Sequence, residues 1–257
     1  MGRHRGRGGR VRLTVLGCAG SFPSAESPCS SYLVEAGGYR LLLDLGNGAL
    51  GPLQRYADMY DLDAVLLTHL HPDHWIDLCQ YLVARKYARH TTLPTLPVYG
   101  PAGTAERVAA AYGEGEAAAG VFDFRTLGEG SFDLGPLRIT TALVNHPVDT
   151  FGVRVEHGGR TLTYSSDTAE SPALVKLATG ADAFLCEASF LEDRDNAPDL
   201  HLTGRGAGQH ATRAGARRLL LTHLVPAWGD EELTVAEARS AYAGPVEVVR
   251  SGAVYEV

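Results

Sequence analysis

The chain has 257 residues, of which 45% are hydrophobic and 21% are charged, and it carries a formal net charge of −7 at pH 7. A chain of this length can bury a large core, so we expect a globular protein. The acidic balance argues against a protein that grips nucleic acid through a broad basic surface. A small anionic substrate stays compatible with it, because a bound metal ion can outweigh the global charge locally.

The chain begins with a basic Arg/Gly stretch, MGRHRGRGGR, and a short apolar run follows at residues 13–16. This run is shorter than the core of about 7–15 apolar residues in a secretory signal. No stretch approaches the ~18 apolar residues of a membrane span. The sequence therefore predicts a flexible basic tail over residues 1–10, one domain over residues 11–257, a cytoplasmic location and no membrane partner.

The first third of the chain is rich in predicted strands, which are divided by Gly, Pro and Ser turns. Strands are expected at 11–17, 30–36, 39–46, 63–69 and 96–100. Helices are expected at 48–57 with Asn47 as the N-cap, at 73–89, and at 101–112 with Pro101 near the first turn.

The rest of the chain repeats this order of strands followed by alternating strands and helices. Strands are expected at 122–127, 131–134, 137–144, 150–159, 160–166, 183–188, 217–224, 246–251 and 253–257. Helices are expected at 171–179, 204–215 and 234–243. Two similar batches of this kind favour a layered α/β protein with mixed sheets. No G-x-G-x-x-G opens a helix after a strand and no P-loop is present, so a Rossmann unit is not expected.

The motif THLHPDH, residues 68–74, places three histidines and an aspartate just after a predicted buried strand. In an extended or turning segment, His69 and His71 project to one side, while Asp73 and His74 reach a neighbouring point. Four such ligands within a few residues crowd a single tetrahedral centre and suit two metal ions a few Å apart. Imidazole with carboxylate favours two Zn²⁺ ions, although Mn²⁺, Fe²⁺ or Ni²⁺ can occupy the same kind of site.

Three further ligands are predicted where other strand-like runs end, at His146, Asp167 and His223. Strands that end at one edge of a sheet deliver their loops to one place, where sites are built. The resulting hypothesis has Asp167 bridging two metals, with a shared hydroxide completing both coordination shells. The first metal is held by His69, His71 and His146, and the second by Asp73, His74 and His223.

His201 is the remaining histidine of interest, because it lies just before Thr203, a predicted helix N-cap. A histidine beside a dimetal centre, when it is not a ligand, can stabilise charge on the attacked group or protonate the leaving group. We therefore predict His201 as a catalytic residue, together with Asp73, which positions the second metal. The alternative is a loop histidine that only orders the turn.

The order THLHPDH, NHP, SSDT, HLT and LTHL resembles the metallo-β-lactamase fold superfamily, and within it the branch of ribonuclease Z and related phosphodiesterases. The likeness covers nearly the whole chain, since LTVLGCAGSFPSAESPCSSYLVEAGGYRLLLDLGNG is similar to the opening strands of that branch. The resemblance implies an αβ/βα four-layer sandwich, in which two mixed β-sheets are flanked by helices. It also implies two zinc ions and the ligand roles given above.

Differences within the superfamily narrow the interpretation. Class B β-lactamases usually have Cys or His where Asp167 stands, flavodiiron proteins have Glu at the place of His71, and glyoxalase II-like thioesterases have a GHTPG-like turn in place of NHPVDTFGVRVE. Ribonuclease Z commonly carries a long arm that clamps tRNA, often between the third histidine and the bridging aspartate. Here only residues 147–166 lie between His146 and Asp167, enough for one hairpin and no arm. HLT also replaces the usual HST.

The expected function is that of a dinuclear zinc-dependent hydrolase whose metal-bridging hydroxide is the nucleophile. Its expected substrates are small phosphodiesters, cyclic ones in particular. The alternatives are a tRNA 3′-processing endonuclease of the ribonuclease Z type and a lactone, thioester or amide hydrolase that uses the same site; an inactive zinc-binding scaffold is the least favoured. The expected partner is a small anionic molecule, nucleic acid is less favoured, and a homodimer is allowed.

Overall fold

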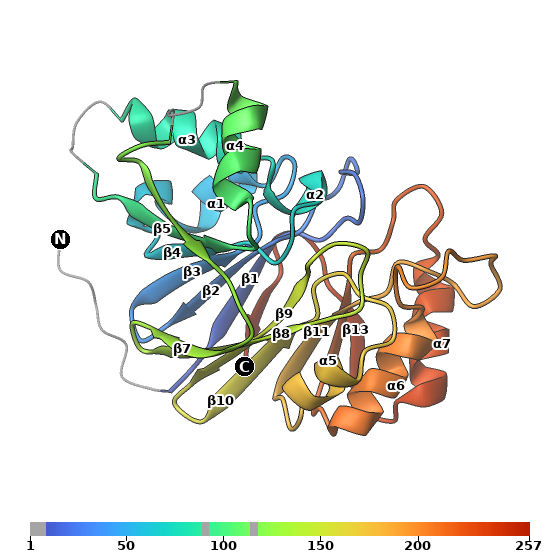
Figure 1. The fold of residues 1–257 in the computed structure, drawn as a ribbon. Coiled ribbons are helices and arrows are strands. Elements are labelled where there is room, and N and C mark those ends of the chain that lie inside the picture. The colour runs from blue at the N-terminus through green and yellow to red at the C-terminus, as the bar shows by residue number, and fades with distance from the viewer. Residues whose placement is uncertain (1–8, 89–92, 114–117) are drawn as a thin grey trace.

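The computed structural model describes residues 9–88, 93–113 and 118–257. Two seven-stranded mixed sheets lie face to face, and helices cover the outer side of each (Figure 1). This αβ/βα arrangement of four layers confirms the predicted fold class. Of the predicted tail over residues 1–10, only Gly9 and Arg10 belong to the described part of the chain.

The first sheet has the strand order β14-β1-β2-β3-β4-β5-β6. Its strands are β1 (Arg12–Gly17), β2 (Ser31–Ala36), β3 (Tyr39–Leu43), β4 (Ala64–Leu66), β5 (Leu96–Gly100), β6 (Phe122–Thr126) and β14 (Val254–Glu256). The pairs from β14 to β3 are antiparallel, and those from β3 to β6 are parallel.

The second sheet has the order β13-β12-β11-β10-β9-β8-β7 and the same division into two kinds of pairing. Its strands are β7 (Gly130–Leu134), β8 (Leu137–Leu143), β9 (Phe151–His157), β10 (Arg160–Tyr164), β11 (Ala183–Glu187), β12 (Leu219–Thr222) and β13 (Val246–Val248). The pairs from β7 to β10 are antiparallel, and those from β10 to β13 are parallel.

The helices divide between the two outer layers, with α1 to α4 on the first sheet and α5 to α7 on the second (Figure 1). Their bounds are α1 (Leu50–Tyr56), η1 (Met59–Asp61), α2 (Pro72–Trp75), α3 (Leu78–Lys86), α4 (Thr104–Tyr112), α5 (Pro172–Leu177), α6 (Gly204–Ala214) and α7 (Glu231–Ala241). None of the helices in the described ranges has both the length and the apolar character needed to cross a lipid bilayer.

Alternating side chains explain why the strands hold four layers together. In β2, Tyr32 and Val34 point into the core between the sheets, whereas Leu33 points into the core under the helices. All three are fully buried, because successive side chains of a strand face opposite sides of the sheet and both sides are covered here. A third core lies between the second sheet and its helices and includes Ala211 and Leu221.

Three of the predicted helices begin or divide differently in the structure. The helix expected at 73–89 is two short helices, α2 and α3, because the Asp77 N–H donates to the Leu45 carbonyl at 3.2 Å instead of to the carbonyl four residues back. The Asp77 carboxylate accepts a hydrogen bond from the Leu50 N–H at 2.9 Å. Asp77, and not the predicted Asn47, therefore accepts a hydrogen bond from the free N–H at the start of α1. The N-cap residue of α1 is Ala49, which has no side chain that could do so. The predicted end of that helix, residue 89, lies outside the described ranges.

The last helix begins at Glu231 instead of residue 234, because Asp230 caps it by accepting a hydrogen bond from the Leu233 N–H at 3.0 Å. The helix expected from Pro101 begins only at Thr104, after a left-handed Gly103. The strand expected at 63–69 is shorter, and β4 ends at Leu66. The first histidine of the THLHPDH motif therefore lies in the loop beyond the strand.

Candidate metal centre

The seven predicted ligands meet at one edge of the sandwich, where strands of both sheets end. The THLHPDH segment follows β4 and runs into α2, whereas the other three ligands follow β8, β10 and β12. The side chains form two groups, in each of which one nitrogen or oxygen per residue lies within 4.8 Å of the others. The groups are His69, His71, His146 and Asp167, and Asp73, His74, Asp167 and His223.

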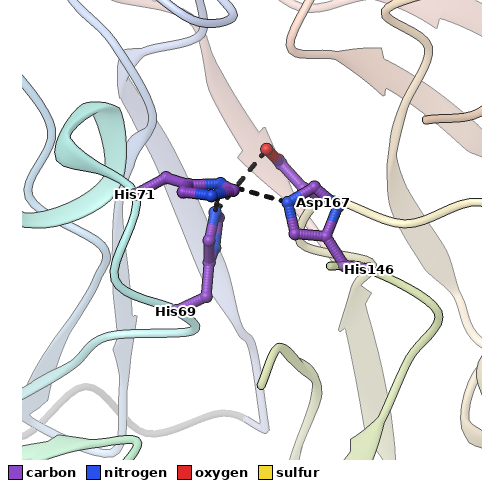
Figure 2. A group of neighbouring side chains, drawn as sticks. All are labelled: His69, His71, His146 and Asp167. Atoms are coloured by element: carbon purple, nitrogen blue, oxygen red, sulfur yellow. Dashed lines mark hydrogen bonds and ion pairs between the residues drawn. The ribbon is translucent and has the colours of Figure 1, made fainter. Parts of the chain in front are cut away.

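The first group is arranged around His71 (Figure 2). Nδ1 of His71 lies 3.2 Å from Nε2 of His69 and 3.1 Å from Nε2 of His146. Oδ2 of Asp167 lies 3.7 Å from the same nitrogen of His69. Three ring nitrogens and a carboxylate oxygen therefore converge on one point, which is a set of donors that suits zinc.

The second group lies deeper and shares Asp167 with the first. Oδ1 of Asp167 is 3.2 Å from Nε2 of His74 and 3.4 Å from Nε2 of His223. These two ring nitrogens are 3.2 Å apart, and Oδ2 of Asp73 is 3.2 Å from that of His223. Each oxygen of Asp167 thus faces a different group, which is the arrangement of a bridging carboxylate.

Hydrogen bonds on the outer side of the rings fix which nitrogen carries the proton. His74 donates from Nδ1 to Oδ2 of Asp44 at 2.8 Å, and His146 donates from Nδ1 to the carbonyl oxygen of Leu200 at 2.9 Å. A carboxylate and a carbonyl can only accept, so each Nδ1 holds a proton and each Nε2 is left facing the cluster. Outer partners of this kind orient metal-ligating histidines and raise their basicity.

The charge of the cluster favours a cation. Burial lowers the pKa of His69, His71 and His146, so these rings are neutral at pH 7. Burial opposes ionisation of Asp167 too, yet the adjoining His223 and His74 hold its pKa well below the usual range. Burial would also lower the pKa of His74, but the surrounding carboxylates, Asp167 first, raise it well above 6.5. The carboxylates thus draw positive charge onto Nε2 of His74, and a metal ion competes with a proton for that lone pair.

One buried atom tests whether metal ions fit this site. Asp167 is 2% exposed, and its Oδ1 is buried without a hydrogen-bond partner among the described residues. A buried polar atom that lacks a partner costs free energy, about 1–3 kcal/mol and more for a charged group. A metal ion supplies the partner that donors do not, so the ligand set fits two divalent cations.

Backbone strain is concentrated around this cluster. Five non-glycine residues in the described ranges have a positive φ, a conformation that costs an L-residue roughly 1–2 kcal/mol. They are Ser21, which donates its N–H to Asp73; Asp44, which accepts from His74; Ser166, next to Asp167; Asp199, next to Leu200; and His223. Each of the five residues belongs to the site, forms a hydrogen bond with a site residue, or is next in the chain to a residue of one of these two kinds. The strained backbone therefore lies in the turns that orient the side chains of the site.

His201 lies at the mouth of the site, between the two groups. Its ring centroid is 5.5 Å from that of His146 and 5.6 Å from that of His223. Its Nδ1 donates to Oε1 of Glu187 at 2.8 Å, and the Glu187 carboxylate is fully buried. Burial alone would lower the pKa of His201, but the Glu187 carboxylate raises it to about 9. His201 therefore lies beside the cluster with its ring fixed by Glu187 and protonated at pH 7.

Sequence reasoning missed two carboxylates of this site. Asp44 directly follows β3 and accepts hydrogen bonds from the Thr68 N–H at 2.7 Å and from the Tyr164 hydroxyl at 3.1 Å, besides that of His74. Glu187 is the last residue of β11 and also accepts from the Thr168 N–H at 2.7 Å. Both stand where an apolar strand ends, which is the same signal that indicated the predicted ligands.

Replacing Asp44 with asparagine is expected to weaken metal binding by about 10–100-fold, as the loss of an outer carboxylate partner generally does. Asparagine tolerates the left-handed backbone of this position, so the loop should keep its course. Competition with a chromophoric chelator measures the affinity. Asp182→Asn is a matched control, because Asp182 also accepts a backbone N–H, that of Thr161, away from the site. Equal affinities of the Asp44 variant and the native protein would contradict the expectation.

Comparison with known proteins places the chain in a family. The model of the β-lactamase superfamily domain matches residues 39–224. The chain belongs to this superfamily, and its fold and site define a metallo-hydrolase with a metallo-β-lactamase fold. Membership implies that the protein binds divalent metal and hydrolyses its substrate, and the family resemblance predicted from the sequence is confirmed.

Three relatives match nearly the whole chain. The Mycobacterium tuberculosis protein Rv1339 is 43% identical over 256 residues, which cover 96% of this chain and 92% of that protein. The probable metallo-hydrolase YhfI of Bacillus subtilis is 32% identical over 96% of this chain and all of its own length, and its crystal structure superposes with a TM-score of 0.87 over 97% of this chain and 100% of that one. A ribonuclease Z of Mycolicibacterium paratuberculosis is 35% identical, covering 93% of this chain and 95% of that protein.

Proposed function

We propose that the protein is a dinuclear zinc-dependent phosphodiesterase that acts on small phosphodiesters, cyclic ones in particular. The observation that carries the proposal is Asp167, which directs one buried carboxylate oxygen at each of two groups of imidazole side chains. Two divalent ions held there would lower the pKa of a shared water toward about 7 and offset the charge that builds on the attacked phosphate.

The chain's own residues position the reacting groups. Asp73 is held by the backbone N–H of Ser21, which donates to its Oδ2 at 2.9 Å, so its carboxylate keeps one orientation beside His223. Across the mouth, the ring of His201 is fixed by Glu187 and leaves Nε2 for the substrate. His201 would bond a phosphate oxygen or give its proton to the leaving alkoxide.

The short segment between His146 and Asp167 supports a small substrate. The chain from His146 to Asp167 contains only β9 and β10, paired as an antiparallel hairpin with Arg160 opposite His157. The segment therefore contains no long arm of the kind with which ribonuclease Z clamps tRNA. The likeness to a relative named ribonuclease Z supports phosphodiester chemistry and keeps tRNA 3′-end cleavage as the second candidate.

The substrate class can be tested by measuring hydrolysis of phosphodiesters and of carboxylic esters by the same preparation of the protein. We expect the zinc-loaded protein to hydrolyse bis(p-nitrophenyl) phosphate and cyclic AMP, and kcat/KM for the former should exceed that for p-nitrophenyl acetate by at least about tenfold, or about 1.4 kcal/mol of transition-state stabilisation. A chelator should abolish the activity, and added Zn²⁺ or Mn²⁺ should restore it. A preference for esters or lactones would overturn phosphodiester hydrolysis, and salt-sensitive cleavage of a tRNA precursor would favour the second candidate.

A further inference from the structure

Several exposed apolar side chains belong to the segments that carry site residues. Eight large hydrophobic side chains are exposed in the described parts of the chain, and four of them stand at strand ends or in loops that carry site residues. Leu143 and Val148 lie on either side of His146 in the chain, whereas Phe22 follows Ser21 and Trp228 lies in the loop after His223. Exposed apolar surface on the segments that build a charged centre indicates a substrate with an apolar part beyond its phosphate.

Two of these four side chains, Phe22 and Trp228, contact each other. Their ring centroids are 6.2 Å apart and their planes are inclined at 67°, an edge-to-face contact. Phe22 is 40% and Trp228 50% exposed, so each ring retains open surface beyond the contact with its partner. A tryptophan this exposed loses the stabilisation of burial, whereas an open indole face is suited to stacking on another flat ring.

The two loops that carry this pair are tied to each other and to the metal ligands. The N–H of Gly20 donates to the carbonyl of Leu224 at 3.1 Å, and the next N–H, that of Ser21, donates to Oδ2 of Asp73 at 2.9 Å. From that bond and the length of one residue, Cα of Phe22 lies within roughly 8 Å of the Asp73 carboxylate. The turn bearing Trp228 is closed by the Gly229 N–H, which donates to the Val225 carbonyl at 2.7 Å.

We propose that Phe22 and Trp228 form a stacking platform for a nucleobase, and that the substrate is a cyclic nucleotide with its phosphodiester at the metal centre. The proposal rests on the phosphodiesterase function above and narrows its substrate class. In a nucleotide one sugar separates the base from the phosphate. Phe22 is the residue after Ser21, which bonds to Asp73, so the pair lies at a distance from the metal centre that one sugar can span. Aromatic side chains bind bases through their faces and tolerate different bases, because every base has a π-face.

The kinetic test compares two substrates that differ only in the base. Phe22→Ala and Trp228→Ala are each expected to raise KM for cyclic AMP about tenfold, the usual scale for losing one stacking side chain. The kcat should stay within about twofold, because an interaction made equally in the ground and transition states affects KM alone. KM for methyl riboside 3′,5′-cyclic phosphate, which lacks the base, should not change. Trp228→Phe should recover most of the loss, since it restores an aromatic face.

Tyr87→Ala is the matched control, because Tyr87 is 64% exposed and lies just beyond α3, outside the two loops. It should leave both KM values unchanged. Equal changes of KM for the two substrates in the Phe22 and Trp228 variants would show a general effect on the loops and overturn the platform. Unchanged KM values in those variants would overturn it as well.

A binding measurement separates failure of this inference from failure of the proposed function. Adenosine 3′,5′-cyclic phosphorothioate is a slowly hydrolysed analogue and should quench the fluorescence of exposed Trp228 in the native zinc-loaded protein. Trp228→Phe should lose most of this quenching, since the other tryptophan, Trp75, is buried and donates to the Leu70 carbonyl. Absence of turnover of both cyclic substrates and of bis(p-nitrophenyl) phosphate would refute the phosphodiesterase function. Absence of quenching in the native protein would refute the platform whatever the turnover.

Discussion

Replacing Asp167 with alanine is expected to strip metal from the site and to abolish hydrolysis. Asp167 is the one residue that belongs to both ligand groups, and its two oxygens face His69 on one side and His74 on the other. Without it, the first group retains only neutral imidazoles. We expect metal content to fall from the proposed two ions per chain to one or none. The rate on bis(p-nitrophenyl) phosphate should fall by more than about 10³-fold, because metal stabilisation of the transition state is worth several kcal/mol.

Two further variants test whether the loss of metal results from the loss of the bridging carboxylate. Asp167→Asn keeps the shape but removes the charge, so it should also fail to hold two ions. His71→Ala removes a ligand of the first group alone and should leave one ion with the second group. Metal content after desalting and thermal unfolding in a chelator are measured for all three, so that loss of metal is distinguished from loss of the fold. Two ions per chain in the Asp167→Ala variant would remove its bridging role.

The candidate site could be located from the sequence because its signals are local. Each predicted ligand stands just after an apolar run, and a parallel strand that ends at a sheet edge leaves its next residues at that edge. His223 after β12 and Asp167 after β10 follow this rule. The THLHPDH motif adds four neighbouring side chains in one turn. The grouping of the seven residues in space therefore needed no knowledge of strand order, whereas their role as ligands stays a proposal.

Groups without a side-chain signal could not be found in this way. The partner of His146 is the carbonyl oxygen of Leu200, which any residue could supply, so its position depends on how the loop before α6 folds back. Asp44 and Glu187 did carry the strand-end signal, but nothing in the sequence distinguishes a carboxylate that orients a histidine from one that faces solvent. Only the packing of β3 and β11 beside the site makes that distinction.

The broken helix after the motif shows the same limit in the fold. The periodicity of apolar residues predicts one helix over 73–89, and it does continue through α3. Asp77 interrupts it because its N–H donates to the carbonyl of Leu45, in the segment that follows β3. A tertiary hydrogen bond of this kind overrides local propensity and leaves no periodic trace. Exposure of Phe22 and Trp228 is likewise a property of two assembled loops and not of either sequence segment.

Replacing His201 with alanine is expected to leave both metal ions in place and to lower kcat by about 10²-fold or more. His201 is held by Glu187 and faces the mouth of the site, and it is not needed to complete either of the two groups that contain Asp167. Its loss should therefore remove a proton donor or a charge-stabilising contact and not a metal. His157→Ala serves as the control, because His157 stands at the end of β9 and its ring donates to the Pro136 carbonyl, away from the site. Unchanged turnover in the His201→Ala variant would remove its catalytic role, and loss of one metal would make it a ligand.

The leaving group of the substrate separates the two roles that His201 can have. If His201 protonates the leaving oxygen, its loss should matter little for p-nitrophenolate, which leaves readily as an anion, and much more for the ribose alkoxide of cyclic AMP. If it instead stabilises charge on the attacked phosphate, the loss should be similar for both substrates. The Glu187 carboxylate, 2.8 Å from Nδ1, raises the pKa of His201 and so keeps a proton on the ring. We therefore expect the larger loss on cyclic AMP, and equal losses on the two substrates would assign His201 to charge stabilisation.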